Sequence, residues 1–179
     1  MSRDYYFPRR WSWLMGLFLL AAPFRVSYSL APPQVTTIYI IRHAEKLNAT
    51  PDTPLSPAGK VRAKTLAHVL KDAQISAIFA TNFQRSQQTA APLATANSLT
   101  PIVYPATTPS VAVNQILANH VGGRILVVGH SNTVDDLAGG LGVSGVGELA
   151  ETHFDRMIIV HRTISGVFAQ RLRYGTPTP

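Results

Sequence analysis

The chain contains no cysteine, so disulfide bonds take no part in holding its fold together. It also has no apolar run of the roughly 20 residues that a helix needs to cross a bilayer. Arginine-rich runs and basic patches interleaved with aromatic residues are missing, so we expect no nucleic-acid partner. Neither a Gly-x-Ser-x-Gly sequence nor a histidine pair four residues apart occurs. These absences disfavour a serine hydrolase of the nucleophile-elbow type and a zinc protease.

The first thirty residues differ in composition from the remainder. A start that contains Arg3, Arg9 and Arg10 is followed by an almost wholly apolar stretch at 11–24 and then by small residues up to position 31. This order is typical of a secretory signal peptide. We therefore predict that residues 1–30 direct export to the periplasm or the cell exterior. An uncleaved anchor is the alternative, and only in that case do we expect the protein at a membrane.

Net charge and length describe the part that remains, residues 31–179. The full chain carries +7, and the first thirty residues hold four arginines and one aspartate, which leaves +4 on the remainder. A mildly positive protein suits a small anionic substrate. The remaining length is sufficient for one domain with its own core.

Strand and helix patterns alternate along this domain, and they predict an α/β fold. Short β-branched or apolar runs alternate with helical segments, of which 57–72 shows apolar residues at positions i, i+3, i+4 and i+7. The strands are expected at 36–41, 76–80, 101–104 and 124–128, and the helices at 57–72, 83–96, 111–120 and 135–141. Two final strands, 156–161 and 167–173, are expected to form an antiparallel edge, and Pro177–Pro179 is expected to be disordered. The predicted architecture is a three-layer sandwich with a mostly parallel sheet flanked by helices.

Two histidines follow two of the predicted strands directly. His43 stands in Arg42-His43-Ala44-Glu45, and His130 stands in Gly129-His130-Ser131-Asn132. Ligands of parallel sheets gather at the carboxyl ends of the strands, so we expect both histidines to line one pocket. His43, Glu45 and His130 are also conceivable metal ligands. Nearby arginines would repel a cation, so we expect neither a metal nor another cofactor.

These blocks resemble the histidine phosphatase superfamily, which includes phosphoglycerate mutases and many phosphatases. The resemblance rests on Arg42-His43-Ala44-Glu45, on 81–89 with Arg85, and on Gly129-His130-Ser131-Asn132; 55–59 and 88–90 match in order as well. It implies that His43 is the nucleophile that becomes phosphorylated and that His130 donates a hydrogen bond to the phosphoryl group. Arginine offers a planar fork suited to phosphate oxygens, so we assign Arg42 and Arg85 to phosphate binding. Ser131 and Asn132 are expected to add N–H donors at a helix start.

The proton donor for the leaving group is the missing element. The resemblance implies a glutamate before the second histidine or an aspartate directly after it, but residues 103–129 contain no acidic residue and Ser131 follows His130. The remaining candidates are Glu45, Asp52 and Glu148. We favour Glu45 because it lies two positions after the nucleophile, whereas Asp52 is expected to order its loop. A substrate with a good leaving group would need no strong acid.

The sequence therefore predicts a phosphatase that hydrolyses a phosphate monoester, or another phosphorylated small molecule, through phosphohistidine at His43. A mutase is disfavoured, because it needs an intermediate that cytoplasmic metabolism supplies. The alternative from another class is a non-catalytic module that binds phosphate ligands and lacks an acid. The other four histidines are expected to have structural or surface roles: His68, His120, His153 and His161.

Overall fold

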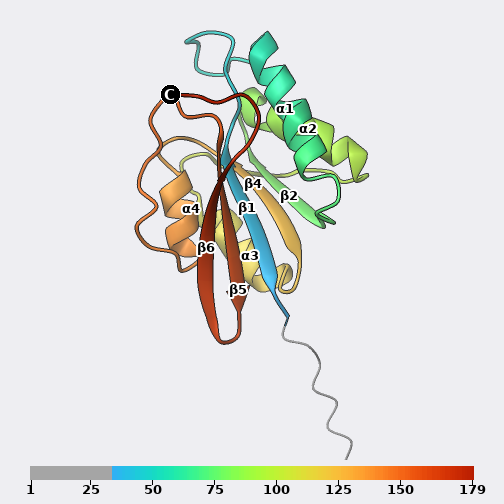
Figure 1. Ribbon diagram of the computed structural model, residues 1–179, viewed down its shortest axis with the longest axis vertical. Coiled ribbons are helices and arrows are strands. Elements are labelled where there is room, and N and C mark those ends of the chain that lie inside the picture. Colours follow the sequence, from blue (N-terminus) through green and yellow to red (C-terminus); the bar gives the residue numbers. More distant parts are fainter. Residues whose placement is uncertain (1–33) are drawn as a thin grey trace, which may run out of the picture. The chain divides into compact units, whose positions relative to one another are not determined.

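The computed structural model describes residues 34–179 (Figure 1). The predicted signal segment, 1–30, lies outside the described residues. Six strands form one sheet in the order β3-β2-β4-β1-β5-β6. Their bounds are β1 Thr36–Arg42, β2 Ala77–Thr81, β3 Ile102–Tyr104, β4 Arg124–Gly129, β5 Arg156–Thr163 and β6 Gly166–Arg173. β1 to β4 are parallel, whereas β5 runs antiparallel to β1 and pairs with β6 in an antiparallel hairpin.

Helices cover both faces of the sheet (Figure 1). α1 (Pro57–Val69) and α2 (Gln84–Ala96) lie on one face, and α3 (Ser110–Asn119) and α4 (Val134–Gly140) lie on the other. Successive side chains of a strand point to opposite faces. Along β4, Ile125 and Val127 therefore pack toward α3 and α4, whereas Leu126 and Val128 pack toward α1 and α2. The predicted three-layer fold with an antiparallel C-terminal edge is confirmed.

α1 begins close to the end of β1. The hydroxyl of Ser56 accepts a hydrogen bond from the Gly59 N–H at 3.0 Å and so caps the helix, which has Pro57 in its first position. Gly59 lies so close to the backbone of Glu45 that a Cβ there would stand 2.2 Å from the Glu45 carbonyl oxygen. Only glycine allows this approach without a backbone shift. The 55–59 block thus fixes α1 against the segment that carries His43.

A long irregular segment, residues 141–155, connects α4 to β5, and we call it the 141–155 loop. Its backbone is anchored to the sheet end, since the Leu149 N–H donates to the Ser131 carbonyl at 3.1 Å. At its end Asp155 is buried and accepts a hydrogen bond from the Thr178 hydroxyl at 2.8 Å. The expectation of a disordered C-terminus was therefore wrong for Thr178, because a buried carboxylate needs hydrogen-bond partners.

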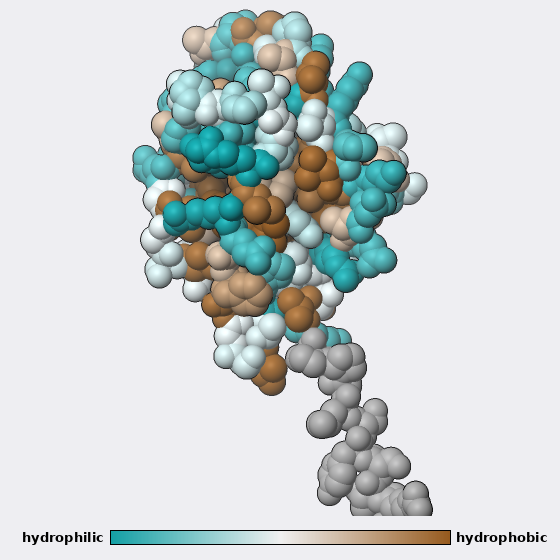
Figure 2. Space-filling model, in the orientation of Figure 1, coloured by the Kyte–Doolittle hydropathy of each residue, from teal (hydrophilic) through white to brown (hydrophobic). Residues whose placement is uncertain are grey.

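The surface of the domain is mixed in polarity. Figure 2 shows hydrophobic and hydrophilic side chains interspersed on the face that carries the β5–β6 hairpin. Ile164 at the hairpin turn and Phe168 on β6 are among the exposed hydrophobic residues. No helix within residues 34–179 combines the length and the apolar character that crossing a membrane would require.

Candidate active site

The sheet brings the predicted site residues to one edge. Arg42 ends β1 and His43 follows it, His130 directly follows β4, and Arg85 lies in the first turn of α2, just after β2. Because β1 and β2 are the two neighbours of β4 and all three are parallel, their carboxyl ends meet. The imidazole rings of His43 and His130 stand edge to face, with centroids 5.1 Å apart. The structure therefore brings the two histidine rings together at this edge of the sheet, and their roles stay a prediction.

One hydrogen bond defines the tautomer of His43. Its Nδ1 lies 2.8 Å from the carbonyl oxygen of Ala44. A carbonyl can only accept, so Nδ1 carries the proton and Nε2 holds the lone pair. The Ala44 N–H donates to the Thr89 hydroxyl at 2.9 Å, which fixes this carbonyl-bearing residue against α2. His43 is thus oriented with a basic nitrogen available for reaction.

His130 is held from two sides. Its Nε2 lies 3.1 Å from the Thr81 hydroxyl, which itself donates to the Ser86 hydroxyl at 2.7 Å. With the Thr81 proton engaged, Nε2–H of His130 is the donor and Nδ1 carries the lone pair. Nη2 of Arg85 lies 3.5 Å from that Nδ1. The His130 ring therefore lies between the hydroxyls of Thr81 and Ser86 on one side and the Arg85 guanidinium on the other.

Burial and positive neighbours keep both histidines neutral. Burial lowers the pKa of His43 to about 3, and the nearby His130, Arg42 and Arg85 add to this effect. Burial also lowers the pKa of His130 to about 4, with further contributions from Arg85 and Arg42. Neutral imidazole is the nucleophilic form, so His43 is ready for attack at neutral and mildly acidic pH.

Each arginine is stacked on a phenylalanine. The guanidinium of Arg42, which is only 2% exposed, lies 4.3 Å from the ring centroid of Phe154. The guanidinium of Arg85 lies 4.2 Å from the ring centroid of Phe83, which also packs edge-on against His130. Such stacking holds a guanidinium in place and leaves the edge of its plane available for hydrogen bonds.

Arg85 is also positioned by the loop that precedes α1. Its Nη1 donates to the Pro51 carbonyl at 2.8 Å. The neighbouring Asp52 accepts a hydrogen bond from the N–H of Gln84, the first residue of α2, at 2.8 Å. The hydrogen bonds from the backbone and side chain of Gln84 lower the pKa of Asp52. Asp52 therefore holds its loop against the start of α2, whereas the sequence led us to expect that it orders only the loop before α1.

Glu151, which is not among the candidate acids named from the sequence, lies against Arg42 and Ser131. Oε2 of Glu151 is 2.6 Å from Nη2 of Arg42, and Oε1 accepts a hydrogen bond from the Ser131 hydroxyl. Nη1 of Arg42 donates to the carbonyl of the adjacent Ala150 at 3.0 Å. The bond from Ser131, together with Arg42, lowers the pKa of Glu151, although burial acts in the opposite direction. The 141–155 loop thus places an anion on the residues predicted to bind phosphate.

Glu45 has a different environment. Its Oε1 accepts from Nε of Arg62 at 2.9 Å and lies 2.8 Å from Nη2 of the same guanidinium. Arg62 is buried and also donates to the carbonyls of Tyr174 and Thr176. The Arg62 guanidinium thus engages Oε1 of Glu45 through two of its nitrogens. A role for Glu45 as proton donor stays a prediction.

The two residues after His130 differ in exposure. Ser131 is buried and its hydroxyl donates to Glu151, whereas Asn132 is exposed and lines a hollow next to His130. α4 begins only at Val134, with Thr133 accepting a hydrogen bond from the His130 N–H at 3.0 Å. Phosphate binding by backbone groups of Ser131 and Asn132 stays a prediction.

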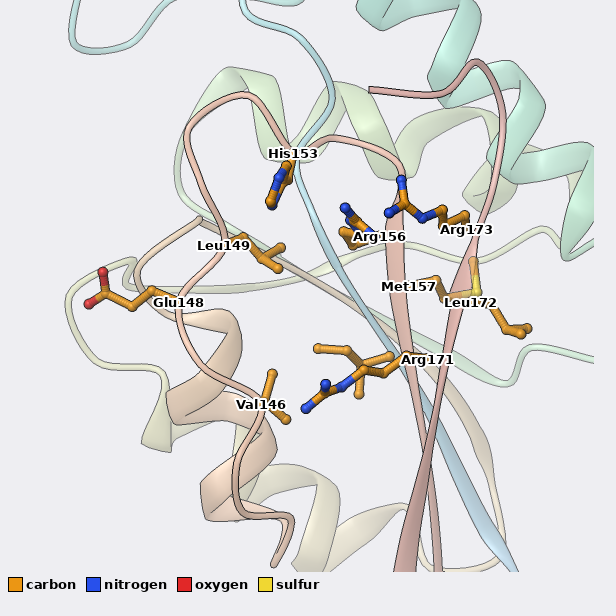
Figure 3. A pocket seen from close by; sticks show the side chains of 10 residues that line it. Val146, Glu148, Leu149, His153, Arg156, Met157, Arg171, Leu172 and Arg173 are labelled. Carbon is orange, nitrogen blue, oxygen red and sulfur yellow. The ribbon is translucent and has the colours of Figure 1, made fainter. Parts of the chain in front are cut away.

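A second hollow of about 300 Å³ lies between the 141–155 loop and the β5–β6 hairpin (Figure 3). Leu149 and Met157 supply apolar lining, and Arg171 and Arg173 supply charge. Glu148, one of the candidate acids, belongs to this hollow, whose lining includes neither His43 nor His130. Within the described residues, no three His, Cys, Asp or Glu side chains are grouped closely enough to hold a metal ion.

Comparison with known proteins agrees with this geometry. Residues 38–106 match the histidine phosphatase superfamily (branch 1). This segment contains Arg42, His43 and Arg85, whereas His130 and Glu151 lie beyond it. The family match therefore covers part of the segment on which the motif resemblance rests.

Two curated relatives match part of the chain. The uncharacterized protein Rv0525 of Mycobacterium tuberculosis strain H37Rv is 36% identical over 74 residues. The matched segment spans 37% of this chain and 37% of that relative. The uncharacterized protein MT0547 of strain CDC 1551 matches to the same extent.

Solved structures share the fold over most of the chain. The protein histidine phosphatase SixA, solved with tungstate, superposes with a TM-score of 0.62 at 22% identity and covers 76% of this chain and 96% of its own. The mycobacterial glucosyl-3-phosphoglycerate phosphatase Rv2419c superposes with a TM-score of 0.55 at 15% identity and covers 71% of this chain and 90% of its own. Its complex with inorganic phosphate has a TM-score of 0.56 at 16% identity and covers 71% of this chain and 94% of its own. At these identities the likeness shows the phosphoglycerate mutase-like α/β fold.

Proposed function

We propose that the protein is a phosphatase that hydrolyses a phosphorylated small molecule through a phosphohistidine at His43. The observation that carries the proposal is the pairing of a neutral, oriented imidazole with two stacked arginines at one edge of the sheet. A nucleophilic nitrogen surrounded by fixed cations suits a phosphoryl group, whose charge lies on its non-bridging oxygens.

The reaction then proceeds in two displacements. Nε2 of His43 attacks phosphorus, the bond to the leaving oxygen breaks, and that oxygen departs with the electron pair and takes up a proton. Arg42 and Arg85 bind the non-bridging oxygens, and His130 binds them after it gains a proton from solvent or substrate, since its Nδ1 is unprotonated in the free site. A water molecule then attacks the phosphorus of phosphohistidine, which releases inorganic phosphate and restores neutral His43.

We propose Glu151 as the group that supplies the proton to the leaving oxygen. Its carboxylate is already bound to Arg42, and its side chain is 70% exposed, so it faces both the phosphoryl site and the solvent side from which a leaving group departs. A phosphate that binds to Arg42 competes for the guanidinium and places negative charge next to Glu151. Both changes favour the protonated form of the carboxyl group. Glu45 lacks this exposure and is paired with Arg62.

Hydrolysis of an aryl phosphate tests the proposal. Wild-type protein is expected to release phosphate, and His43→Ala is expected to lower kcat by about 10³-fold or more, as loss of a nucleophile does. His68→Ala is a matched control, because His68 is exposed on α1. Equal turnover by wild type and His43→Ala would contradict a phosphohistidine mechanism.

One observation favours the alternative of a non-catalytic phosphate-binding module. Glu151 occupies Arg42 and Ser131, so the free site already holds an anion of its own. Tight binding of phosphate or vanadate by a wild-type protein that hydrolyses no phosphate ester would support this alternative against the phosphatase.

For localisation, we propose that residues 1–30 direct export and that the domain acts outside the cytoplasm. The support is the order of basic, apolar and small residues in this segment. Fractionation of cells that express the full chain, with N-terminal sequencing of the product, tests this proposal. A cytoplasmic product that retains residue 1 would contradict export, and a membrane-bound product of full length would indicate an anchor.

A further inference from the structure

A groove leads away from His130 and Arg85 between α3 and α4. Its inner part is a hollow of about 440 Å³ that touches Arg85 and His130. Its outer part is a hollow of about 420 Å³ that extends along α3 to Asn114 and Leu117. Thr107, Pro109 and Asp136 line both hollows, so the two parts form one continuous groove.

Hydrogen-bonding and apolar side chains share the lining of the groove, and only two of its residues are charged. Hydroxyl and amide groups come from Thr107, Thr108, Ser110, Asn114, Asn132 and Thr133. Arg85 is the one cationic residue of the lining, and it lies at the inner end beside His130. Asp136 is the one carboxylate of the lining, and it lies where the two hollows meet. The groove is therefore suited to an anion only at its inner end.

Several of these groups are free to bind a ligand. Within residues 34–179, the side chains of Ser110, Asn114, Asn132 and Asp136 make no hydrogen bond or ion pair, and all four are exposed. Their donors and acceptors match hydroxyl groups of a ligand, which donate and accept in the same way. A second carboxylate or phosphate on the ligand would meet Asp136 with no cation beside it, which is unfavourable.

We infer that this groove holds the leaving group of the substrate and that Asp136 selects hydroxyl-bearing phosphate monoesters without further negative charge. The inference rests on the proposed phosphatase function and names its substrate class. The phosphoryl group lies against Arg85 and His130, and the alcohol part extends past Thr107 and Asp136 toward Asn114. Polyol and sugar monophosphates have this chemistry, whereas phosphorylated carboxylic acids and bisphosphates do not.

A matched pair of substrates tests the inference. Glycerol 3-phosphate and 3-phosphoglycerate are alike in size, but the second carries a carboxylate where the first carries a hydroxymethyl group. We expect wild-type kcat/KM to favour glycerol 3-phosphate by about tenfold. Asp136→Lys reverses the charge at the centre of the groove and is expected to shift this ratio by about tenfold toward 3-phosphoglycerate. Asp72→Lys, at an exposed acidic residue beyond the end of α1, is the control and leaves the ratio unchanged.

A second variant tests the outer part of the groove. Asn114→Trp adds bulk at an exposed position of α3, so it is expected to lower kcat/KM for sorbitol 6-phosphate at least fivefold and to change that for glycerol 3-phosphate less than twofold. Two results would overturn the inference while an aryl phosphate is still hydrolysed. One is an equal loss of kcat/KM on both substrates in Asn114→Trp. The other is that Asp136→Lys leaves unchanged the ratio of kcat/KM for glycerol 3-phosphate to that for 3-phosphoglycerate. Failure to hydrolyse even the aryl phosphate would overturn the proposed function, and the inference with it.

Discussion

The two sides of the active site are built from different kinds of structure. On one side, Arg42, His43 and His130 stand at the ends of adjacent buried strands, where the sheet fixes their spacing. On the other side, Glu151 and Phe154 come from the 141–155 loop, whose three glycines at 142, 145 and 147 have positive φ. Arg42 joins the two sides, since it bonds to Ala150 and Glu151 and stacks on Phe154. A rigid side thus holds His43, the proposed nucleophile, and a loop delivers the Glu151 carboxylate.

Replacing the joining arginine should have the largest effect. Arg42→Lys keeps the positive charge but loses the planar guanidinium that can donate two parallel hydrogen bonds. We therefore expect kcat/KM to fall on the order of 10²-fold. The loop should also become more sensitive to proteases, because its anchor at Ala150 weakens. Arg85→Ala is the comparison. It should lose phosphate affinity and remain folded, with no change in cleavage of the loop.

Isothermal titration with phosphate and limited proteolysis together check this difference. Equal protease sensitivity in both variants would contradict the view that Arg42 joins the two sides. Unchanged phosphate affinity in Arg85→Ala would remove Arg85 from the site.

Glu151→Gln tests the loop side alone. If Glu151 protonates the leaving oxygen, kcat for an alkyl phosphate should fall about 10²-fold, whereas kcat for p-nitrophenyl phosphate, which has a good leaving group, should fall less than about threefold. Glu148→Gln is the control, because Glu148 belongs to the hollow on the other side of the loop. An equal fall on both substrates, or a gain on both, would show that Glu151 does not act as the acid.

The buried histidines of the rigid side should make stability depend on pH. The pKa values of His43 and His130 in the folded protein, about 3 and about 4, lie below that of a histidine in the unfolded chain. The unfolded state therefore binds more protons as pH falls below about 6.5, and each histidine should lower the free energy of unfolding by up to about 1.4 kcal/mol per pH unit. Above that pH, this contribution to stability is fully present.

Urea unfolding at pH 6.5, 5.5 and 4.5 measures this slope. His43→Gln should make it shallower, and the exposed His68→Gln should not. An identical slope in wild type and His43→Gln would contradict the burial of a neutral His43.

The two stacked phenylalanines should give the smallest effects, one on each side. Phe83→Leu loosens Arg85, and Phe154→Leu loosens Arg42 from the loop; each should raise KM about two- to fivefold, the value of one cation–π contact. Only Phe154→Leu should also weaken the coupling between Arg42 and Glu151. A double-mutant cycle of Phe154→Leu with Glu151→Gln measures that coupling. If the effects of the two substitutions on KM simply add, Phe154 does not influence the pairing of Arg42 with Glu151.

The sequence predicts the strand side well for a physical reason. A β-branched run followed at once by Arg42-His43, or by His130, fixes both the element and the position of the residue at its end. The helix bounds agree to within a few residues, because Ser56 and Pro57 mark a helix start locally. These signals depend on neighbours in sequence, so they need no knowledge of the tertiary path.

The loop side could not be predicted in the same way. Glu151 lies 109 positions from Arg42, and the segment between α4 and β5 has no periodicity that would place it. Glu148, three residues earlier and a candidate acid from the sequence, lies in a separate hollow. Only the path of the loop decides which of the two carboxylates meets the arginine. The pairing of Glu45 with Arg62 depends likewise on the packing of α1 against the end of β1.

Trapping the phosphoenzyme tests the central proposal most directly. Wild-type protein mixed with an aryl phosphate and quenched within milliseconds should carry an acid-labile, alkali-stable phosphate, which peptide mass spectrometry should locate on His43. His130→Ala should still form this adduct, although more slowly, and His43→Ala should form none. A phosphate on His130, or full turnover with no phosphohistidine in the wild type, would contradict the account.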